Sequence, residues 1–171
     1  GKGAMYASVQ RPMFPETELQ KADVSVSNPP FNLKSSVSED ITKDLPLKYT
    51  CNFAFVAHCL QRGERCALIL PRGVLTSKEE LECRKYLISK GWLKAAISLP
   101  EKMFESTSVA TCILLLDKKN ISKEVMLVNA EKMKSVEVRE QRGEGNASHY
   151  NRIYKKEFNT FSDEQIAAIC E

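Results

Sequence analysis

Hydrophobic and polar positions along the chain follow two different periods, and their order predicts an α/β protein. Five runs are apolar, or alternate with a period of two, over the length of a strand. They cover residues 22–27, 65–71, 93–99, 109–116 and 125–128. Between the first two runs, Phe53, Val56 and Leu60 stand at i, i+3 and i+7, which predicts a helix of about three turns that ends near Gly63.

Two capping boxes predict two further helices. Ser77 and Glu80 have the spacing at which a serine hydroxyl and a glutamate carboxylate satisfy each other's backbone N–H groups. The helix that they open is expected to end at Gly91, a residue that adopts the left-handed conformation of a helix C-cap without strain. Ser162 and Gln165 repeat the spacing and predict a closing helix.

This order of elements predicts a mostly parallel sheet with helices on its faces, joined by right-handed crossovers, and an antiparallel strand pair near the end. The continuous run 65–71 is expected to be buried on both faces. Four or five strands make half of a doubly wound sheet, in which ligands bind at the carboxyl ends of the strands. The turns after Ser27, Leu70 and Leu99 are therefore expected along one rim.

Three regions follow from these patterns. Residues 1–21 contain Pro12 and Pro15 and no clean period, so they are predicted to be a connecting segment. Residues 22–130 hold the α/β unit. Residues 131–171 are predicted to be a polar extension, with a loop of little fixed structure over 131–157 before the closing helix.

Composition excludes several classes of protein. With 43% hydrophobic and 27% charged residues, the 171-residue chain is neither a disordered tail nor a fibre. Its longest apolar run, 109–116, is far shorter than the roughly 20 residues that span a bilayer. Six cysteines without a Cys-x-x-Cys pair predict no disulfide framework and no metal site, and they favour the reducing cytoplasm. The formal net charge of +3 permits DNA binding without implying it.

The tetrapeptide Asn28-Pro29-Pro30-Phe31, at the carboxyl end of the first strand, is the most informative motif. A conjugated exocyclic amine is a poor nucleophile because its lone pair is delocalised into the ring. Two acceptors beside its N–H bonds help to localise that lone pair, and the Asn28 amide oxygen and the Pro29 carbonyl, fixed by the next proline, are such a pair. Phe31 adds a flat face on which an extruded base can stack. The motif predicts methyl transfer to a base amine, against the alternative of a strand terminator with a core aromatic.

Other residues with chemical potential are better explained by structure. His58 lies in the middle of a predicted helix between apolar neighbours, as a structural histidine does. Glu79, Glu80 and Glu82 are expected to stabilise the positive end of a helix dipole, and Ser77 lacks a partner arrangement that would make it a nucleophile.

The chain resembles the amino-group DNA methyltransferases, and within them the modification subunit of type I restriction-modification systems. Ser27 and the tetrapeptide resemble the family's catalytic motif, and the later matches occur in the family's order. These later matches are the segments 55–58, 63–75, 84–88, 98–100 and 111–118, with Phe104 and Thr107. The similarity runs from about Ala22 to Lys118 and more weakly to the closing helix.

The resemblance implies a Rossmann-like methyltransferase that methylates adenine N6 of DNA with S-adenosylmethionine. It also implies work with a specificity subunit and, in some systems, a restriction subunit. Asn28, Pro29, Pro30 and Phe31 are then the catalytic residues, and Phe104 is expected to border the pocket of the flipped-out adenine, opposite Phe31. An apolar anchor that closes the end of the sheet is the alternative role for Phe104.

In this family the glycine-rich cofactor loop precedes the catalytic motif, whereas only 27 residues precede Asn28 here. Neither Gly1-Lys2-Gly3 nor Gly143-Glu144-Gly145 sits in a strand-to-helix turn, so no cofactor-binding residue is assigned. The chain is therefore expected to be the C-terminal part of a catalytic domain, silent alone and self-associating through an unpaired sheet edge. Two alternatives stay open: a methyltransferase for ribosomal RNA or protein glutamine, and a non-catalytic interaction fragment.

Overall fold

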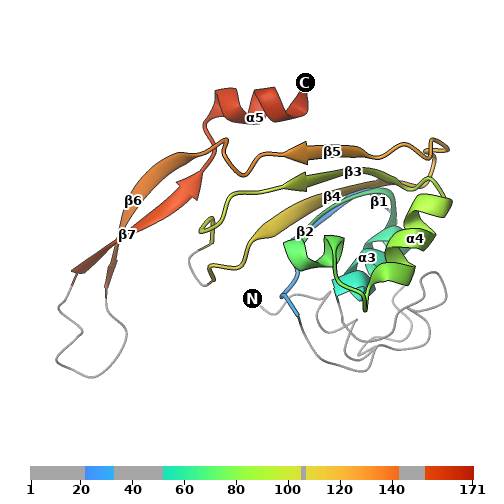
Figure 1. Ribbon diagram of the computed structural model, residues 1–171, viewed down its shortest axis with the longest axis horizontal. Helices are drawn as coiled ribbons and strands as arrows, with labels where there is room; N and C mark the ends of the chain where they lie inside the picture. The colour runs from blue at the N-terminus through green and yellow to red at the C-terminus, as the bar shows by residue number, and fades with distance from the viewer. Residues whose placement is uncertain (1–21, 33–51, 105–106, 143–152) are drawn as a thin grey trace. The chain divides into compact units, whose positions relative to one another are not determined.

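The structure is a computed structural model that describes residues 22–32, 52–104, 107–142 and 153–171. The strands are β1 (Ala22–Ser27), β2 (Gly63–Pro71), β3 (Leu93–Ser98), β4 (Thr111–Asp117), β5 (Met126–Asn129), β6 (Ser135–Arg142) and β7 (Ile153–Thr160). The helices are α3 (Asn52–Arg62), the 3-10 helix η1 (Arg72–Leu75), α4 (Leu81–Ser89) and α5 (Asp163–Cys170) (Figure 1). They form two compact units: Gly1–Ser98 with Thr111–Val128, and Leu99–Ala110 with Asn129–Glu171.

The first unit is built on a five-stranded sheet in the order β1-β2-β4-β3-β5. β1 and β2 are parallel, with Ser27 beside Leu68, whereas β4 runs antiparallel to both β2 and β3. β1, β2 and β3 therefore share one direction, and their carboxyl ends meet at one rim. The predicted α/β class is confirmed, and so is the expectation that the first three strands end at a common rim.

The core of this unit lies between the sheet and one layer of helices. Leu68, Leu70 and Leu114 point from the sheet into a cluster with α3 and α4, and each is at most 2% exposed. On the other face, the β2 side chains of Ala67 and Ile69 are only half-buried. The expectation that β2 is buried on both faces is thus wrong: in the described part of the chain, only the face toward α3 and α4 is closed.

α4 shows how local sequence determines the ends of an element. The Glu80 N–H donates to Ser77 Oγ at 3.3 Å just before the helix begins. After the helix, Gly91 has a φ of 73°, and a Cβ there would stand 2.9 Å from the Ser122 carbonyl oxygen. Asn120 Nδ2 donates to the Gly91 carbonyl oxygen at 2.6 Å, so a polar side chain holds this left-handed turn in place.

The second unit contains the hairpin of β6 and β7, which pair antiparallel from Ser135 with Thr160 to Arg142 with Ile153. The predicted loop over 131–157 is therefore wrong. Phe158 is the buried anchor of the hairpin at 1% exposure, and Arg139 and Lys156 lie over its ring at 5.1 and 5.3 Å from the centroid. The closing helix α5 has the predicted capping box. None of the helices in the described ranges has the length and apolar character needed to cross a membrane.

Candidate active site

The Asn-Pro-Pro-Phe tetrapeptide lies immediately after β1, at the common rim. Ser27, the last residue of β1, is 7% exposed and forms a side-chain hydrogen bond with the Cys59 thiol of α3. This contact fixes the end of the strand against the helix. Asn28 thus begins a turn whose starting point is held in place.

Within the turn, Pro29 is the one buried side chain of the four. Pro29 is buried and Pro30 exposed, and both lack an N–H group. Asn28 is exposed and Phe31 is half-buried, so an amide and an aromatic ring are both available at the rim. The arrangement can present an acceptor and a stacking surface to a planar amine.

Asn32, which follows the motif, has a φ of 52° in the left-handed region. Its N–H donates to Asn52 Oδ1 and its Oδ1 accepts from Asn52 Nδ2, each at 3.1 Å. Asn52 Nδ2 also donates to Glu80 Oε1 at 3.2 Å, and the Ser77 hydroxyl donates to Glu80 Oε2 at 3.2 Å. We call Asn32, Asn52, Ser77 and Glu80 the rim network.

Sequence reasoning misses the rim network. Asn52 stands one residue before the first apolar position of the helix pattern, and 20 positions separate it from Asn32. The sequence places Glu80 in a capping box and at the positive end of a helix dipole, yet this residue is 6% exposed and its carboxylate accepts a hydrogen bond from Asn52. One sequence signal could have indicated the network: Asn52 is a polar residue at the start of a helix, and it belongs to no capping-box spacing.

Phe104 lies in the second unit, whereas Phe31 lies in the first. It lines a hollow of about 290 Å³ that also contains lysine side chains. Its other lining residues are Lys102, Thr107, Ser108, Lys155, Lys156, Glu157 and Phe158. An aromatic ring among cationic side chains is suited to a base and its phosphate.

Burial around the site suppresses ionisation. Burial raises the pKa of Cys59 to about 11, and the pKa values of Cys66, Cys83 and Cys112 to about 12. The pKa of His58 is lowered, mainly by burial and secondarily by Arg62. These groups are neutral near pH 7, as the interpretation of His58 as structural requires.

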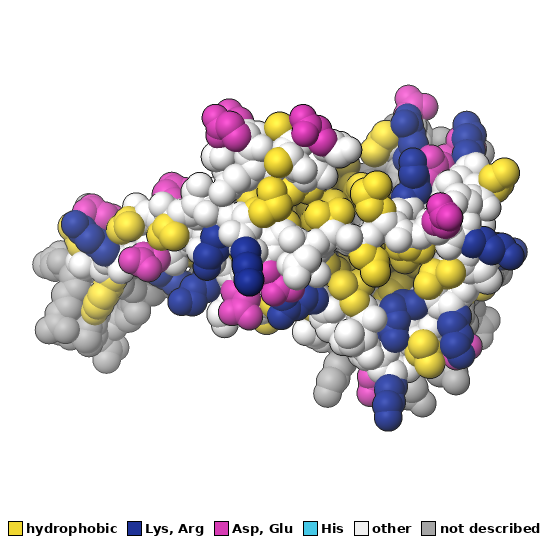
Figure 2. Space-filling view, turned by 45° about the horizontal axis from the view of Figure 1, so that its top comes forward, with side chains coloured by type: hydrophobic (Ala, Val, Ile, Leu, Met, Phe, Trp, Pro, Cys, Tyr) yellow, Lys and Arg dark blue, Asp and Glu magenta, His cyan; other side chains and the backbone are white. Residues whose placement is uncertain are grey.

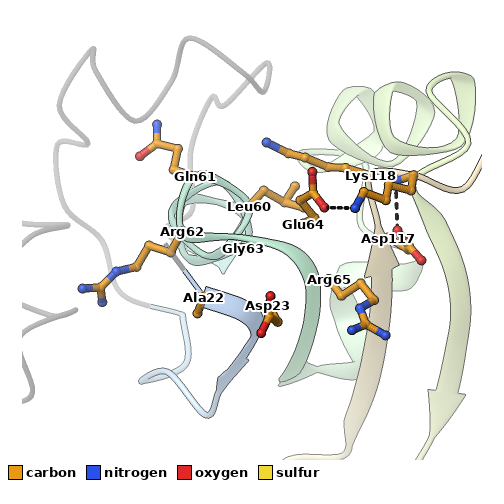
Figure 3. A pocket seen from close by; sticks show the side chains of 11 residues that line it. Ala22, Asp23, Leu60, Gln61, Arg62, Gly63, Glu64, Arg65, Asp117 and Lys118 are labelled. Atoms are coloured by element: carbon orange, nitrogen blue, oxygen red, sulfur yellow. Dashed lines mark hydrogen bonds and ion pairs between the residues drawn. The ribbon is translucent and has the colours of Figure 1, made fainter. Parts of the chain in front are cut away.

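A hollow lies at the opposite rim, at the amino ends of β1 and β2 (Figure 3). Its volume is about 690 Å³, and its lining includes Asp23, Arg62 and Arg65. Glu64 Oε2 and Lys119 Nζ form an ion pair of 2.6 Å there, with both side chains more than half exposed. Exposed pairs of this kind contribute little stability. The hollow does not include the tetrapeptide, and we assign it no function.

Comparison with known proteins decides the family. The family described as N-6 DNA Methylase matches residues 5–170 of the chain. The chain belongs to this family. The methylase subunit of the type I restriction enzyme MpnII, from Mycoplasma pneumoniae, is 34% identical over 116 residues, which are 60% of this chain and 21% of that protein. The chain thus spans about a fifth of the length of this relative.

Solved structures agree with the family. One similar structure is the methyltransferase subunit of a type I restriction-modification system from Streptococcus thermophilus. It superposes on 92% of this N-6 DNA methylase chain with a TM-score of 0.70 and 26% sequence identity, and the match covers 32% of the Streptococcus thermophilus subunit. The EcoKI M protein superposes on 65% of the chain with a TM-score of 0.52 and 20% identity, over 26% of its own length. The second likeness shows the fold alone.

The described residues do not fit the cofactor that the family implies. A cradle for S-adenosylmethionine in this architecture needs a glycine-rich turn between a strand and a helix. The described glycines stand singly: Gly63 follows α3, Gly91 follows α4, and only Gly73 follows a strand. We therefore assign no described residue to the cofactor.

Proposed function

We propose that this chain carries the catalytic turn of a type I modification subunit that methylates adenine N6 in DNA. Residues 22–130 are the C-terminal half of the catalytic domain in this proposal, and 131–171 are an extension to it. The observation that carries the proposal is the Asn-Pro-Pro-Phe turn at the strand rim of a chain that belongs to the N-6 DNA methylase family.

The residues of the turn have separate tasks on the acceptor side of the reaction. Asn28 Oδ1 and the Pro29 carbonyl oxygen accept from the two N–H bonds of the flipped-out adenine amine, which localises its lone pair. Phe31 stacks on the base, a contact that contributes about 1–3 kcal/mol. Phe104 borders the same base in this proposal. When bound to the full-length protein, S-adenosylmethionine would supply the methyl group from its sulfonium and leave as S-adenosylhomocysteine. The amine proton would then pass to water, so the turn itself needs no general base.

The partners in this proposal are DNA, a specificity subunit that selects the site, and in some systems a restriction subunit. The compartment is the cytoplasm. The five described cysteines are free and four of them are buried, which supports a reducing compartment.

Identification of the methyl acceptor tests the proposal. The full-length reading frame that carries this chain, with any specificity subunit encoded beside it, is incubated with S-adenosylmethionine labelled in its methyl group. DNA, ribosomal RNA and protein are supplied in parallel. We expect label in DNA as N6-methyladenine. Label only in RNA or in protein glutamine would contradict the proposal, and label in none of the three would favour an interaction fragment.

A further inference from the structure

The prolines of the catalytic turn restrict its backbone angles at the start of the turn, but they do not restrict the residues at its end. Asn28 is restricted by the following proline, and the rings of Pro29 and Pro30 fix their own φ angles. Phe31 and Asn32 have no such restriction. Asn32 nevertheless adopts a left-handed φ of 52°, which asparagine tolerates better than most residues but does not prefer.

The contacts of Asn52 supply the missing restriction. Its amide oxygen accepts from the backbone N–H of Asn32, and its amide nitrogen donates to the side chain of the same residue. Two bonds between one pair of residues hold both the backbone and the side chain of Asn32. Because Asn52 is 2% exposed, water does not compete effectively for these bonds.

Glu80 orients Asn52 in turn. Its Oε1 accepts from Asn52 Nδ2, which leaves the amide oxygen of Asn52 to face the Asn32 N–H. The Ser77 hydroxyl holds the other carboxylate oxygen, and the Ser77 N–H donates to the Gly73 carbonyl oxygen at 2.9 Å. The network therefore joins the turn after β1 to the segment after β2.

We propose that Asn52 and Glu80 are positioning residues, which aim the Asn28 amide and the Pro29 carbonyl by holding Asn32 in its left-handed conformation. The inference rests on the proposed function. Neither residue contacts the base. Their effect is on the rate of methyl transfer, because misplacement of a reacting group by about 1 Å can slow a reaction roughly 100-fold.

The test uses the full-length reading frame and compares four variants. Asn52→Ala removes all three amide contacts. Asn52→Asp puts a second buried carboxylate against Glu80 and replaces the donor to Asn32 Oδ1 by an acceptor. The double variant Asn52→Asp/Glu80→Gln exchanges amide and carboxylate at constant shape, so the new amide donates to the new carboxylate, and the exposed Asn32 amide turns over so that its Nδ2 donates to position 52. Asn120→Ala is the matched control, since Asn120 also holds a left-handed residue, Gly91, but at the opposite rim.

Each variant is measured for single-turnover methylation, for S-adenosylmethionine affinity and for thermal stability. We expect Asn52→Ala and Asn52→Asp to lose about 10- to 100-fold in single-turnover rate with little change in cofactor affinity. The double variant is expected to recover most of the rate. Asn52→Asp alone is expected to gain rate as the pH falls, because two carboxylates this close share a proton more readily. Asn120→Ala is expected to lose stability while its rate stays that of the parent.

Two results would overturn the inference: Asn52 variants that slow methylation no more than Asn120→Ala does, or a double variant no faster than Asn52→Asp. Asn28→Ala in the same assay separates this failure from failure of the proposed function. If Asn28→Ala is inactive and the Asn52 variants are normal, only the positioning role is wrong. Should Asn52→Ala not fold, hydrogen exchange of the Asn32 amide in the shape-conserving variants tests the same role: exchange must quicken in Asn52→Asp and slow again in the double variant.

Discussion

At the scale of single residues, the site is a short stretch of backbone whose conformation is determined by its neighbours. Prolines restrict the first half of the turn, and the Ser27–Cys59 hydrogen bond holds the strand before it. Asn52 holds the residue after it. Chemistry that depends on two correctly oriented oxygens needs this stiffness more than it needs titratable groups. Burial keeps His58 and the thiols of Cys59 and Cys83 in their neutral forms near pH 7.

Phe104→Leu tests whether Phe104 belongs to the base pocket. We expect a loss of DNA affinity or methylation rate larger than the loss of stability, because leucine has no face on which a base can stack. The control is Tyr154→Leu, which alters an aromatic of the same unit that does not line the hollow, and we expect it to change neither DNA affinity nor methylation rate. DNA-binding titrations and chemical denaturation are compared for both. Loss of stability without the larger functional loss would make Phe104 an apolar anchor.

Buried ionisable groups predict the pH range in which the fold is most stable. The four thiols have raised pKa values in the folded chain, so their stabilising effect is complete below pH 9 and declines as the pH rises toward about 11 to 12. The lowered pKa of His58 acts at the other end, where stability declines as the pH falls below 6.5. The free energy of unfolding is therefore expected to be greatest between about pH 6.5 and 9.

Denaturant titrations across pH measure this profile. Cys66→Ser removes one alkaline titration and should make the fall above pH 9 shallower, by at most about 1.4 kcal/mol per pH unit. The same alkaline slope in the variant as in the parent would show that the Cys66 thiol is not protected by burial.

At the scale of elements, sequence patterns predict best the strands that form the core. The strands β2, β3 and β4 lie within two residues of their predicted bounds, and many of their side chains are buried. β1 and β5 are also found within two residues of their predicted bounds, although most of their side chains are exposed. The pattern misses β6 and β7 because their side chains are mostly exposed: Val136 and Val138 are 58% and 56% exposed, and Phe158 is the hairpin's buried residue. Side-chain pairs between the two strands stabilise such a hairpin. The order of hydrophobic and polar residues along the sequence does not show which residues will form these pairs.

The same reasoning explains which parts of the site could be predicted. The tetrapeptide is contiguous, and its residue types indicate their chemistry. The rim network joins residues 20 and 28 positions apart by side-chain hydrogen bonds, for which a linear pattern has no period. The network forms only when α3 and α4 pack on the same face of the sheet, so the folded structure is needed to identify it.

The outer edge of β1 predicts association between copies. In the described part of the chain β1 pairs with β2 alone, and Val24 and Val26 are 46% and 77% exposed. Figure 2 shows further hydrophobic side chains gathered over the sheet. Because an unpaired apolar edge is a template for another strand, we expect the isolated chain to self-associate as its concentration rises in sedimentation velocity.

Val26→Lys tests this edge, since a charge on an edge strand opposes pairing. The matched control is Ile121→Lys, which places the same charge at a 91% exposed residue outside any strand. Val26→Lys is expected to remain monomeric and Ile121→Lys to associate like the parent. A parent chain that stays monomeric at all concentrations would show that the edge is protected.

At the scale of the whole molecule, the two units contribute different residues to the proposed function. The first holds the catalytic turn and the network that supports it, and the second offers Phe104 with three lysines beside one hollow. The chain spans 21% of the MpnII methylase subunit and 32% of the Streptococcus thermophilus subunit. Membership of the N-6 DNA methylase family is established by the match over residues 5–170, and the activity is proposed from the turn.

The central claim is that the amide of Asn28 takes part in methyl transfer to adenine. The most direct measurement is the rate of N6-methyladenine formation by the full-length reading frame, with and without Asn28→Ala, followed by mass spectrometry of the digested DNA. We predict that the variant melts at the temperature of the parent and loses roughly 100-fold or more in rate, as expected when one aimed hydrogen-bond partner of a transition state is removed. A folded Asn28→Ala variant that methylates adenine as fast as the parent would contradict this claim.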